Sequence, residues 1–276
     1  MVASVAVIQG AGGSLGSHFC RHLLQKSGLS VVATSRDPSA TQRTILEGLE
    51  GGDKLKSRLT VLEVDATRED SMKKAAEVVK KEFGEKSLRM LINSSGVLHA
   101  DKSIASLDAS TLLHSFQINT FAPLLAFKHF YSLLPQKNDI RSSEADQSEA
   151  DPANGIVAPG LGVLATVTAK IGSISDNKKG GWYAYRASKA AANQTILTLQ
   201  RELSLRSTPS IALALHPGTV VGTNLSKPWT KPEDANQKPG HFDPETSTRK
   251  LLETIAKLRK EDGGRFLNYD GADIPW

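Results

Sequence analysis

The feature that most restricts how this chain can fold is a series of short apolar segments without polar alternation. The first begins within the opening residues, MVASVAVIQG, and others recur along the chain. Parallel strands covered on both faces carry apolar residues at nearly every position, whereas strands with one solvated face alternate. The pattern predicts buried strands at Val2–Gln9, Leu29–Ser35, Leu59–Val64, Leu88–Ile92, Gly162–Thr168, Ile211–Leu215 and Arg265–Asn268.

Helical patterns fill the intervals between these segments. They predict helices at Ser14–Lys26, Pro38–Glu50, Glu69–Phe83, Asp108–Leu133, Tyr183–Arg206 and Pro244–Lys260. Alternating strands and helices imply right-handed crossovers, which place helices on both faces of a parallel sheet. We therefore predict an α/β fold with a doubly wound parallel sheet, formed as a single domain over residues 1–276.

Composition limits the class of function. Hydrophobic residues make up 39% of the chain, aromatic residues are few, and the net charge of +5 is not gathered into one basic arm. Nucleic-acid binding is therefore not expected, and a mild positive charge suits a phosphorylated small molecule. The single cysteine, the absence of a membrane-length apolar run and the lack of a signal peptide predict a cytoplasmic protein without membrane contact. No histidine has metal-ligand spacing, so no metal site is predicted.

Two segments depart from the alternation of strands and helices. Residues 135–159 are polar, acidic and without periodicity, which predicts a mobile surface insertion. Residues 225–243 are rich in proline and lysine, which predicts a substrate lid. Substrate specificity is expected to come from this lid and from residues 97–107.

A glycine-rich turn, GAGGSLG, stands between the first predicted strand and the first predicted helix. Glycines let backbone amides approach a pyrophosphate, and the helix N-terminus adds the positive end of its dipole. This context favours a dinucleotide-binding turn over a plain connection. The expected contacts are Gly10, Gly12, Ser14, Leu15 and Gly16, and the Ser14 hydroxyl could bind phosphate or cap the helix.

The end of the second strand, TSRDP, bears on the choice of nucleotide. In dinucleotide-binding folds an acidic residue here binds the ribose 2′-hydroxyl of NAD, whereas an arginine accommodates the 2′-phosphate of NADP. Arg36 can donate two hydrogen bonds to a phosphate, which predicts NADP(H). Asp37 leaves two alternatives open, because it could reach the hydroxyl itself or pair with Arg36.

The stretch GGWYAYRASKAA contains two tyrosines and one lysine. Residues four apart share a helix face, and Tyr185 and Lys189 have this spacing, whereas Tyr183 is followed four residues later by Ala187. An ammonium lowers the pKa of a neighbouring phenol, so Tyr185 is the candidate acid/base and Lys189 its partner. Trp182 and Tyr183 are expected to line the substrate site or to pack.

The motifs in this order resemble the short-chain dehydrogenase/reductase family over nearly the whole chain. GAGGSLG is similar to its glycine turn, NSSG at residues 93–96 to the end of its fourth strand, YRASK at 185–189 to its Tyr-x-x-x-Lys, and HPGTV at 216–220 to its Pro-Gly turn. The stretch GSISDNKKGGWYAYRASKAA and the ending DGADIPW resemble the C-factor-like and carbonyl-reductase-like members more closely. The resemblance implies a Rossmann-type sheet and an NADP(H)-dependent oxidoreductase.

The resemblance also implies roles for single residues. Asn119 matches a helix asparagine that supports a proton-relay water, and an asparagine inside a helix is intrinsically unfavourable. Cofactor contacts are implied for Tyr185 and Lys189 and for Asp65, Ala66, Asn93, Ser94, Gly96, Pro217, Gly218, Val220 and Thr223. Family members assemble through the helices that carry Asn119 and Tyr185, which implies a homodimer or homotetramer.

The residue that polarises the substrate carbonyl is less clear from the motifs. The family uses a serine near the end of the fifth strand, and in TVTAKIGSIS the best-matching position is Ala169. We predict Ser173, with Thr168 and Ser175 as weaker candidates, although Ser173 could also cap a turn.

The sequence thus predicts hydride transfer between NADP(H) and a small carbonyl or alcohol substrate. Tyr185 donates the proton, Lys189 lowers its pKa, Ser173 polarises the carbonyl and Asn119 supports the relay. The alternative is a nucleotide-binding signalling or sensor protein of the same fold with little turnover. The likeness to C-factor-like proteins and the Ala169 substitution keep that alternative open.

Overall fold

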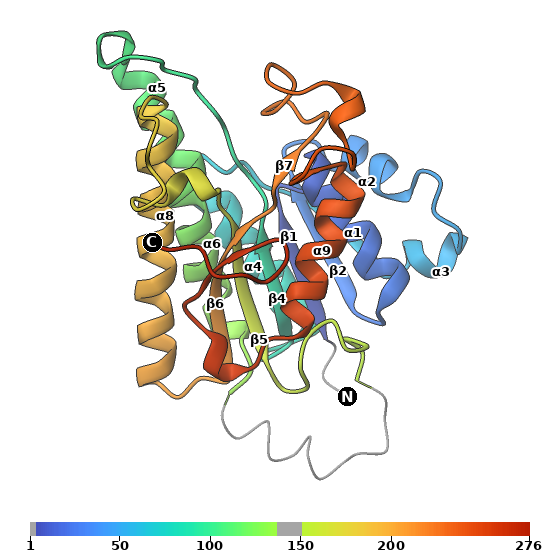
Figure 1. Ribbon diagram of the computed structural model, residues 1–276. Helices are drawn as coiled ribbons and strands as arrows, with labels where there is room; N and C mark the ends of the chain where they lie inside the picture. The colour runs from blue at the N-terminus through green and yellow to red at the C-terminus, as the bar shows by residue number, and fades with distance from the viewer. Residues whose placement is uncertain (1–3, 137–150) are drawn as a thin grey trace.

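A computed structural model describes residues 4–136 and 151–276. Within them, parallel strands form a seven-stranded sheet in the order β3-β2-β1-β4-β5-β6-β9 (Figure 1). The strands are β1 (Val5–Gln9), β2 (Ser30–Ser35), β3 (Leu59–Glu63), β4 (Leu88–Asn93), β5 (Gly162–Val167), β6 (Ser210–His216) and β9 (Phe266–Asn268). The strand order reverses between β1 and β4, which confirms the Rossmann-type doubly wound sheet and places the ligand crevice at that switch point.

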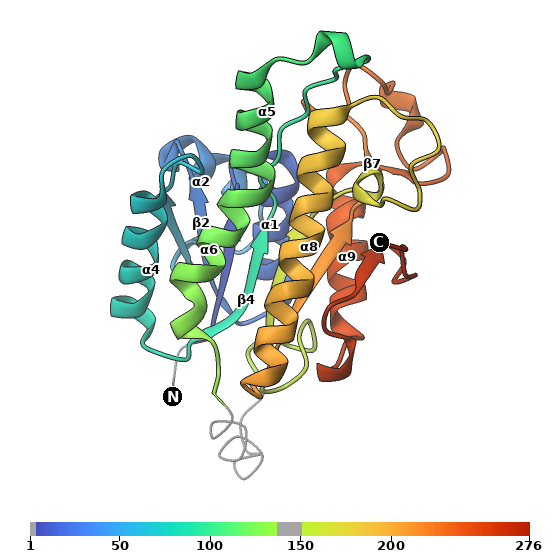
Figure 2. The ribbon, with the colours of Figure 1, turned by 90° about the vertical axis from the view of Figure 1, so that its left-hand side faces the viewer.

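Helices cover both faces of the sheet, as predicted. One face is covered by α4 (Glu69–Phe83), α5 (Ala109–Phe116), α6 (Ala122–Phe130) and α8 (Tyr183–Leu205), and the other by α1 (Ser14–Lys26), α2 (Pro38–Leu46) and α9 (Pro244–Ala256) (Figures 1 and 2). Successive strand residues point to opposite faces. Val7 and Leu91 therefore pack under α4 and α6, whereas Ile8 and Ile92 pack on the opposite side. The two cores fix the register of the sheet.

The predicted helix Asp108–Leu133 is not continuous. It is divided into α5, a π-helical turn at Gln117–Phe121 and α6, and it ends in a short 3₁₀ turn at Tyr131–Leu133. Pro123 has no amide hydrogen and cannot donate to the carbonyl of Asn119, four residues earlier. A π turn is a frequent solution to such a break and is common at functional sites. The predicted helix Pro38–Glu50 is also shorter, because α2 ends at Leu46 and a separate helix, α3 (Gly52–Lys56), follows.

Residues 151–159, the described end of the predicted surface insertion at 135–159, contribute side chains to the core. Asp151 forms a salt bridge with Arg89 at 2.9 Å, and the carbonyl of Pro152 accepts from the amide of Gly28 at 2.7 Å. Ala153 and Val157 are fully buried in the core. These apolar residues were hidden among polar neighbours in the sequence. Residues 137–150 of the predicted insertion lie outside the described part of the chain.

The segments after β4, β5 and β6 lie together at one end of the sheet (Figures 1 and 2). There, β7 (Thr219–Val220) pairs in parallel with β8 (His241–Phe242). This pair joins the end of the predicted lid to the segment that precedes it, and each strand is too short to be recognised from the sequence. Among the described residues, no helix is long and apolar enough to cross a membrane.

Candidate active site

The turn between β1 and α1 is shaped by two glycines, Gly10 and Gly16, that leave no room for a side chain. Gly10 has φ +81°, and a Cβ there would lie 2.4 Å from Ser95 Oγ. A Cβ at Gly16 would lie 2.4 Å from the carbonyl oxygen of Gly10. Gly13 is the N-cap of α1 and provides no side-chain cap, so the alternative in which Ser14 caps the helix is wrong. Gly12, Gly13 and Ser14 are exposed, which leaves the helix N-terminus open to an anion.

The arginine and the aspartate that follow the end of β2 have different surroundings. Asp37 is the N-cap of α2 and accepts from the amide of Ala40 at 2.9 Å, so its carboxylate serves the helix. Arg36 is exposed and makes no ion pair with Asp37. Asp65, after β3, accepts two hydrogen bonds from Thr67, which lower its pKa, and the charge of Arg36 adds to this effect. Ala66 beside it is half-buried.

The end of β4 brings several predicted residues together. Asn93 is fully buried, and its side-chain amide has no hydrogen-bond partner among the described residues. Ser94 Oγ donates to the carbonyl of Gln9 at 2.8 Å. A Cβ built on Gly96 would lie 3.5 Å from Asn119 Oδ1 and 3.7 Å from Lys189 Nζ. The bare backbone of Gly96 therefore allows the asparagine and the lysine to approach the same point.

Asn119 is fully buried in the π-helical turn, where its side chain is held on both sides. Its Oδ1 accepts from the amide of Val97 at 2.9 Å, and its Nδ2 donates to the carbonyl of Val97 and to Ser188 Oγ, both at 3.0 Å. Ser188 lies on α8 between Tyr185 and Lys189. Asn119 thus ties the segment after β4 to the helix that carries the tyrosine and the lysine.

Tyr185 and Lys189 lie on successive turns of α8, as the spacing predicted. Lys189 Nζ lies 5.8 Å from the centre of the Tyr185 ring and donates to the carbonyl of Val167, at the end of β5, at 3.0 Å. Both side chains are almost inaccessible, with exposed fractions of 8% and 3%. Burial lowers the pKa of Lys189 to about 8 and raises that of Tyr185 above its usual value. The lysine is therefore close to its titration point, and the tyrosine is held as a neutral phenol.

The hydroxyl groups after β5 have different partners. Ser173 Oγ donates to the carbonyl of Pro275 at 2.5 Å and accepts from the amide of Asp176. Ser175 Oγ donates to the carbonyl of Trp276 at 2.8 Å. Both serines therefore hold the segment at 275–276 against this loop. Thr168 Oγ1 is buried and has no hydrogen-bond partner among the described residues.

Thr168 belongs to the side of the sheet that faces α8. Leu164 packs in the core beneath α8, and alternation along the strand gives Thr166 and Thr168 the same direction. The amide of Thr168 still bonds to the carbonyl of Leu215 at 2.8 Å, so the extended conformation continues to this residue. Ala169, the position that best matches the family serine, is half-buried and has no hydroxyl.

Aromatic rings surround the start of α8. Gly180, Gly181 and Trp182 all have positive φ, of 63°, 67° and 52°. A left-handed conformation at a bulky residue such as Trp182 is strained, by about 1–3 kcal/mol, and is most often found at functional sites. Trp182 lies edge-on to Tyr185 with ring centres 6.3 Å apart, and it contacts Trp229 of the predicted lid at 5.4 Å.

The turn after β6 has the compact form expected of a Pro-Gly motif. Gly218 has φ +75°, and a Cβ there would lie 2.8 Å from the ring of Phe242. The carbonyl of Pro217 accepts from Ser247 Oγ at 2.8 Å, and Val220 is buried in β7. Thr223 Oγ1 donates to the carbonyl of Val220 at 3.2 Å, so its hydrogen is engaged within the turn.

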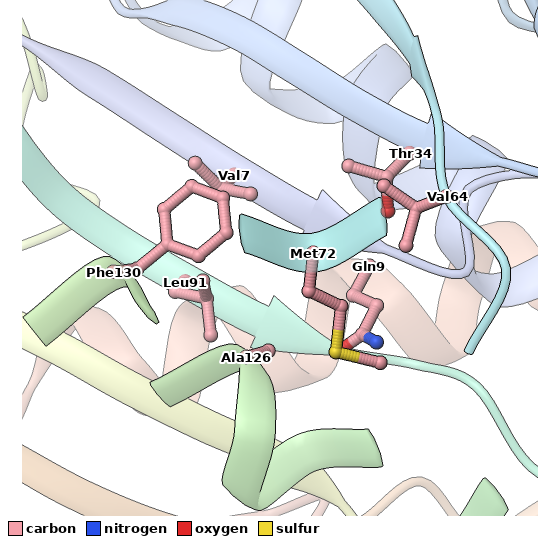
Figure 3. Close-up of a pocket in the computed structure, with 8 residues that line it drawn as sticks. All are labelled: Val7, Gln9, Thr34, Val64, Met72, Leu91, Ala126 and Phe130. Carbon is pink, nitrogen blue, oxygen red and sulfur yellow. The ribbon is translucent and has the colours of Figure 1, made fainter. Parts of the chain in front are cut away.

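A small cavity on the α4–α6 side of the sheet is separate from these residues (Figure 3). It is lined by Val7, Gln9, Thr34, Val64, Met72, Leu91, Ala126 and Phe130. Six of these eight side chains are apolar, and the residues around Tyr185 and Lys189 do not contribute. The cavity is a packing gap between the sheet and helices α4 and α6. Across the described residues, no group of three or more histidine, cysteine, aspartate or glutamate side chains could hold a metal ion.

Sequence comparison places the chain among known proteins. Residues 4–140 match the family model described as short chain dehydrogenase. The chain is 30% identical over 230 residues to 1-hydroxy-2-glutathionyl-2-methyl-3-butene dehydrogenase of Rhodococcus sp. (strain AD45), covering 82% of this chain and 85% of that protein. The chain belongs to the short-chain dehydrogenase/reductase family. It is also 30% identical over 187 residues to C-signal of Myxococcus xanthus, covering 68% of this chain and 92% of that protein.

Solved structures of this family agree with the fold. The NADPH-bound carbonyl reductase from chicken fatty liver superposes with a TM-score of 0.77 at 25% identity, covering 100% of this chain and 99% of the other. Carbonyl reductase Sniffer of D. melanogaster superposes with a TM-score of 0.75 at 24% identity over 100% of both chains. The resemblance to the carbonyl-reductase-like and C-factor-like groups is thus matched by relatives of both kinds.

The structure adds residues that the sequence reasoning missed. Asp101 holds the start of α8, because its main-chain carbonyl accepts from the amide of Trp182 at 2.7 Å and its Oδ2 accepts from that of Ala184 at 3.1 Å. No pattern in the sequence pointed to it. Trp229 was included in the lid without a role. The break at Asn119 did have a local signal, since Pro123 follows it by four residues.

Proposed function

We propose that this protein is an NADP(H)-dependent oxidoreductase that transfers a hydride between the nicotinamide and a carbonyl or alcohol group. The main support is the position of Tyr185 and Lys189. They form a buried acid and ammonium pair on α8, and both Asn119 and Lys189 Nζ lie close to Gly96. A proton donor in this position complements a hydride donor bound at the carboxyl ends of β1 and β4.

The residues at the switch point fit a phosphorylated dinucleotide. The open N-terminus of α1 and the turn residues Gly10, Gly12, Ser14, Leu15 and Gly16 would hold the pyrophosphate. Arg36 is exposed and Asp37 is engaged by α2, which favours the 2′-phosphate of NADP(H) over the hydroxyl of NAD. Asp65 and Ala66 would contact the adenine. The remainder of the cofactor would be surrounded by Asn93, Ser94, Gly96, Pro217, Gly218, Val220 and Thr223. The bound cofactor would supply or accept the hydride.

Tyr185 would act as the general acid in carbonyl reduction. Burial keeps its phenol protonated at neutral pH, which is the form that donates a proton. As the proton leaves, the ammonium of Lys189 stabilises the phenolate, and this effect requires Lys189 to remain charged. The pKa of Lys189, lowered to about 8, sets the upper limit of pH for this arrangement.

For the hydroxyl that polarises the carbonyl, we favour Thr168 over Ser173. The hydrogen of Ser173 is donated to Pro275, and that of Ser175 to Trp276. Thr168 Oγ1 makes no hydrogen bond to the described residues and lies on the α8 side of β5. A donor that is free in the protein can serve the substrate oxygen without breaking another bond.

Asn119 would hold the segment after β4 in place beside the catalytic residues. Its side chain is saturated by Val97 and Ser188, so it keeps the segment after β4 next to Lys189. Pro123 cannot supply the usual α-helical donor to its main-chain carbonyl, and we propose that a relay water binds at this oxygen. A proton could then pass from Lys189 toward solvent.

The central test is to replace Tyr185 with phenylalanine. We expect a panel of aldehydes and ketones to be reduced by the unaltered protein with oxidation of NADPH, and Tyr185→Phe to lower kcat by about a thousandfold. Its affinity for NADPH should stay within about twofold, because the ring is retained. Full activity in Tyr185→Phe would refute the mechanism. NADPH binding by the unaltered protein without oxidation by any carbonyl would favour a sensor.

We also propose a homodimer or homotetramer assembled through α5, α6 and α8. Leu113, Leu124 and Leu205 on these helices, and Phe121 in the π-helical turn between α5 and α6, have exposed fractions between 40% and 87%. Such exposed apolar side chains on neighbouring helices suit a face that another subunit covers. Light scattering at micromolar concentration tests this, and a monomer would contradict it.

A further inference from the structure

We propose that Trp182 and Trp229 form an aromatic clamp that selects planar, aromatic or conjugated carbonyl compounds as substrates. The clamp is defined by these two indole rings. The inference deepens the proposed function and rests on it, because the clamp lies next to Tyr185, the proposed proton donor.

The position of the first ring is set by its backbone. Trp182 adopts the left-handed conformation at the end of a run of three residues with positive φ. Arg186 of α8 fixes this turn by donating to the carbonyl of Gly181 at 3.0 Å, and Asp101 accepts the amide hydrogen of Trp182 at 2.7 Å. A strained residue persists only where its surroundings over-determine it. The turn therefore holds the Trp182 indole at the edge of the Tyr185 ring, at 6.3 Å and 70°.

The second ring comes from the segment between β7 and β8. Trp229 lies 5.4 Å from Trp182 with the ring planes at 49°, a tilted contact within the range of favourable aromatic pairs. Its side chain is still 48% exposed, so a large part of the indole is free to contact another molecule. Trp182 is the shared neighbour of Trp229 and Tyr185. An aryl group attached to a carbonyl at the Tyr185 hydroxyl would reach these rings.

The charge of the site argues for a neutral or anionic aromatic group. Aromatic clusters also bind cations, but Lys189 already places an ammonium 5.8 Å from the Tyr185 ring. Lys102 and Lys227, on the segments beside the clamp, are exposed. These ammonium groups disfavour a cationic substrate, and the carboxylate of Asp101, which accepts from the amide of Ala184 at 3.1 Å, offsets part of this effect.

A matched pair of substrates separates ring stacking from mere size. Benzaldehyde and cyclohexanecarbaldehyde have similar bulk, and only benzaldehyde has an aromatic face. With NADPH, we would measure kcat/KM for both aldehydes in the unaltered protein and in Trp229→Leu, which keeps apolar bulk but removes the ring. Conjugation lowers the intrinsic reactivity of benzaldehyde, so the informative value is the change in the phenyl-to-cyclohexyl ratio between the two proteins.

We expect Trp229→Leu to lower this ratio by about two- to tenfold, the value of one aromatic contact, and Trp229→Phe to restore most of it. Trp276→Leu is the matched control. Trp276 stacks on Phe266 at 5.4 Å and has no ring contact with Trp182 or Trp229, so the ratio should stay unchanged. An unchanged ratio in Trp229→Leu, or an equal fall in Trp276→Leu, would overturn the proposal.

A binding measurement keeps the clamp testable if the protein turns over no carbonyl. Benzamide and cyclohexanecarboxamide are neutral, matched and resistant to reduction, and their affinities for the NADPH-loaded protein can be compared by calorimetry. Preferential binding of benzamide that is lost in Trp229→Leu would support the clamp even where the proposed oxidoreductase activity has failed. Equal affinities for both amides, with no turnover of either aldehyde, would overturn the clamp as well.

Discussion

The turn after β1 and the loop after β5 end at the same edge of the sheet but are built differently. In the turn, each specific contact involves the backbone: Gly10 fits against Ser95, and Gly16 fits against the carbonyl of Gly10. In the loop, the contacts come from side-chain hydroxyls. Ser173 and Ser175 bond to Pro275 and Trp276, about a hundred positions later in the chain. A backbone site can therefore be recognised from local sequence, whereas a hydroxyl site depends on which distant groups engage each hydroxyl.

The largest effect on kcat is expected at Lys189, which bonds to Val167 at the start of the loop after β5. Lys189→Met keeps the side chain's length and removes its charge, so kcat for reduction should fall by about a thousandfold. In the unaltered protein, the rate should decline above about pH 8, where the ammonium is lost. A pH profile of kcat with NADPH measures both, and a rate that keeps rising beyond pH 9 would contradict the role of the ammonium.

The same variant should be more stable than the original protein. The pKa of Lys189 is lower in the folded than in the unfolded state, so its protonation opposes folding, and this cost is fully present below about pH 8. After allowing for the lost bond to Val167, Lys189→Met should raise the free energy of unfolding by about 2 kcal/mol at pH 7. The gain should shrink as pH rises toward 10. Urea denaturation at both pH values checks the sign.

The two candidate hydroxyls give the most direct test of the loop. Thr168→Val removes the free hydroxyl at nearly constant volume and should lower kcat by about a hundredfold. Ser173→Ala releases Pro275 and should mainly lower the free energy of unfolding, by about 1 kcal/mol. Single-turnover kinetics with NADPH and thermal denaturation of both variants distinguish these outcomes. A large loss of kcat in Ser173→Ala, with little loss in Thr168→Val, would assign the polarising hydroxyl to Ser173.

The glycine turn can be tested with a matched pair. A Cβ at Gly16 would meet backbone atoms at 2.4 and 2.7 Å, so Gly16→Ala must shift the turn and should weaken NADPH binding by about tenfold to a hundredfold. A Cβ at Gly13 would meet only the carbonyl of Gly10, at 3.4 Å, so Gly13→Ala should change the affinity by less than about threefold. Calorimetric titration with NADPH checks both, and equal losses would mean that the turn is not held by this contact.

The smallest effect is expected at the end of β2. Arg36→Ala should lower the preference for NADPH over NADH by about tenfold, because an exposed charged hydrogen bond is lost. Asp37→Ala is the control: it removes the cap of α2 and should cost about 1 kcal/mol of stability without changing the preference. Comparing kcat/KM for NADPH and NADH in both variants tests which residue sets the preference. A preference that changes in Asp37→Ala and not in Arg36→Ala would assign the role to Asp37.

Sequence alone predicted the seven strands of the main sheet, the glycine turn and the pairing of Tyr185 with Lys189. Each depends on local regularities: apolar runs for strands, missing side chains for a tight turn, and a spacing of four for a shared helix face. The π-helical turn at Asn119 also has a local origin, because Pro123 follows Asn119 by four residues.

Only the tertiary structure decided how the polar and aromatic side chains are used. In the structure, Asp37 caps α2, Ser173 bonds to Pro275 and Trp229 contacts Trp182. Thr168 Oγ1 has no hydrogen-bond partner among the described residues. It also buried Ala153 and Val157 in a segment that reads as solvated. The reason is physical: a hydrogen bond or ring contact depends on two groups, and here the second group is often distant in the sequence.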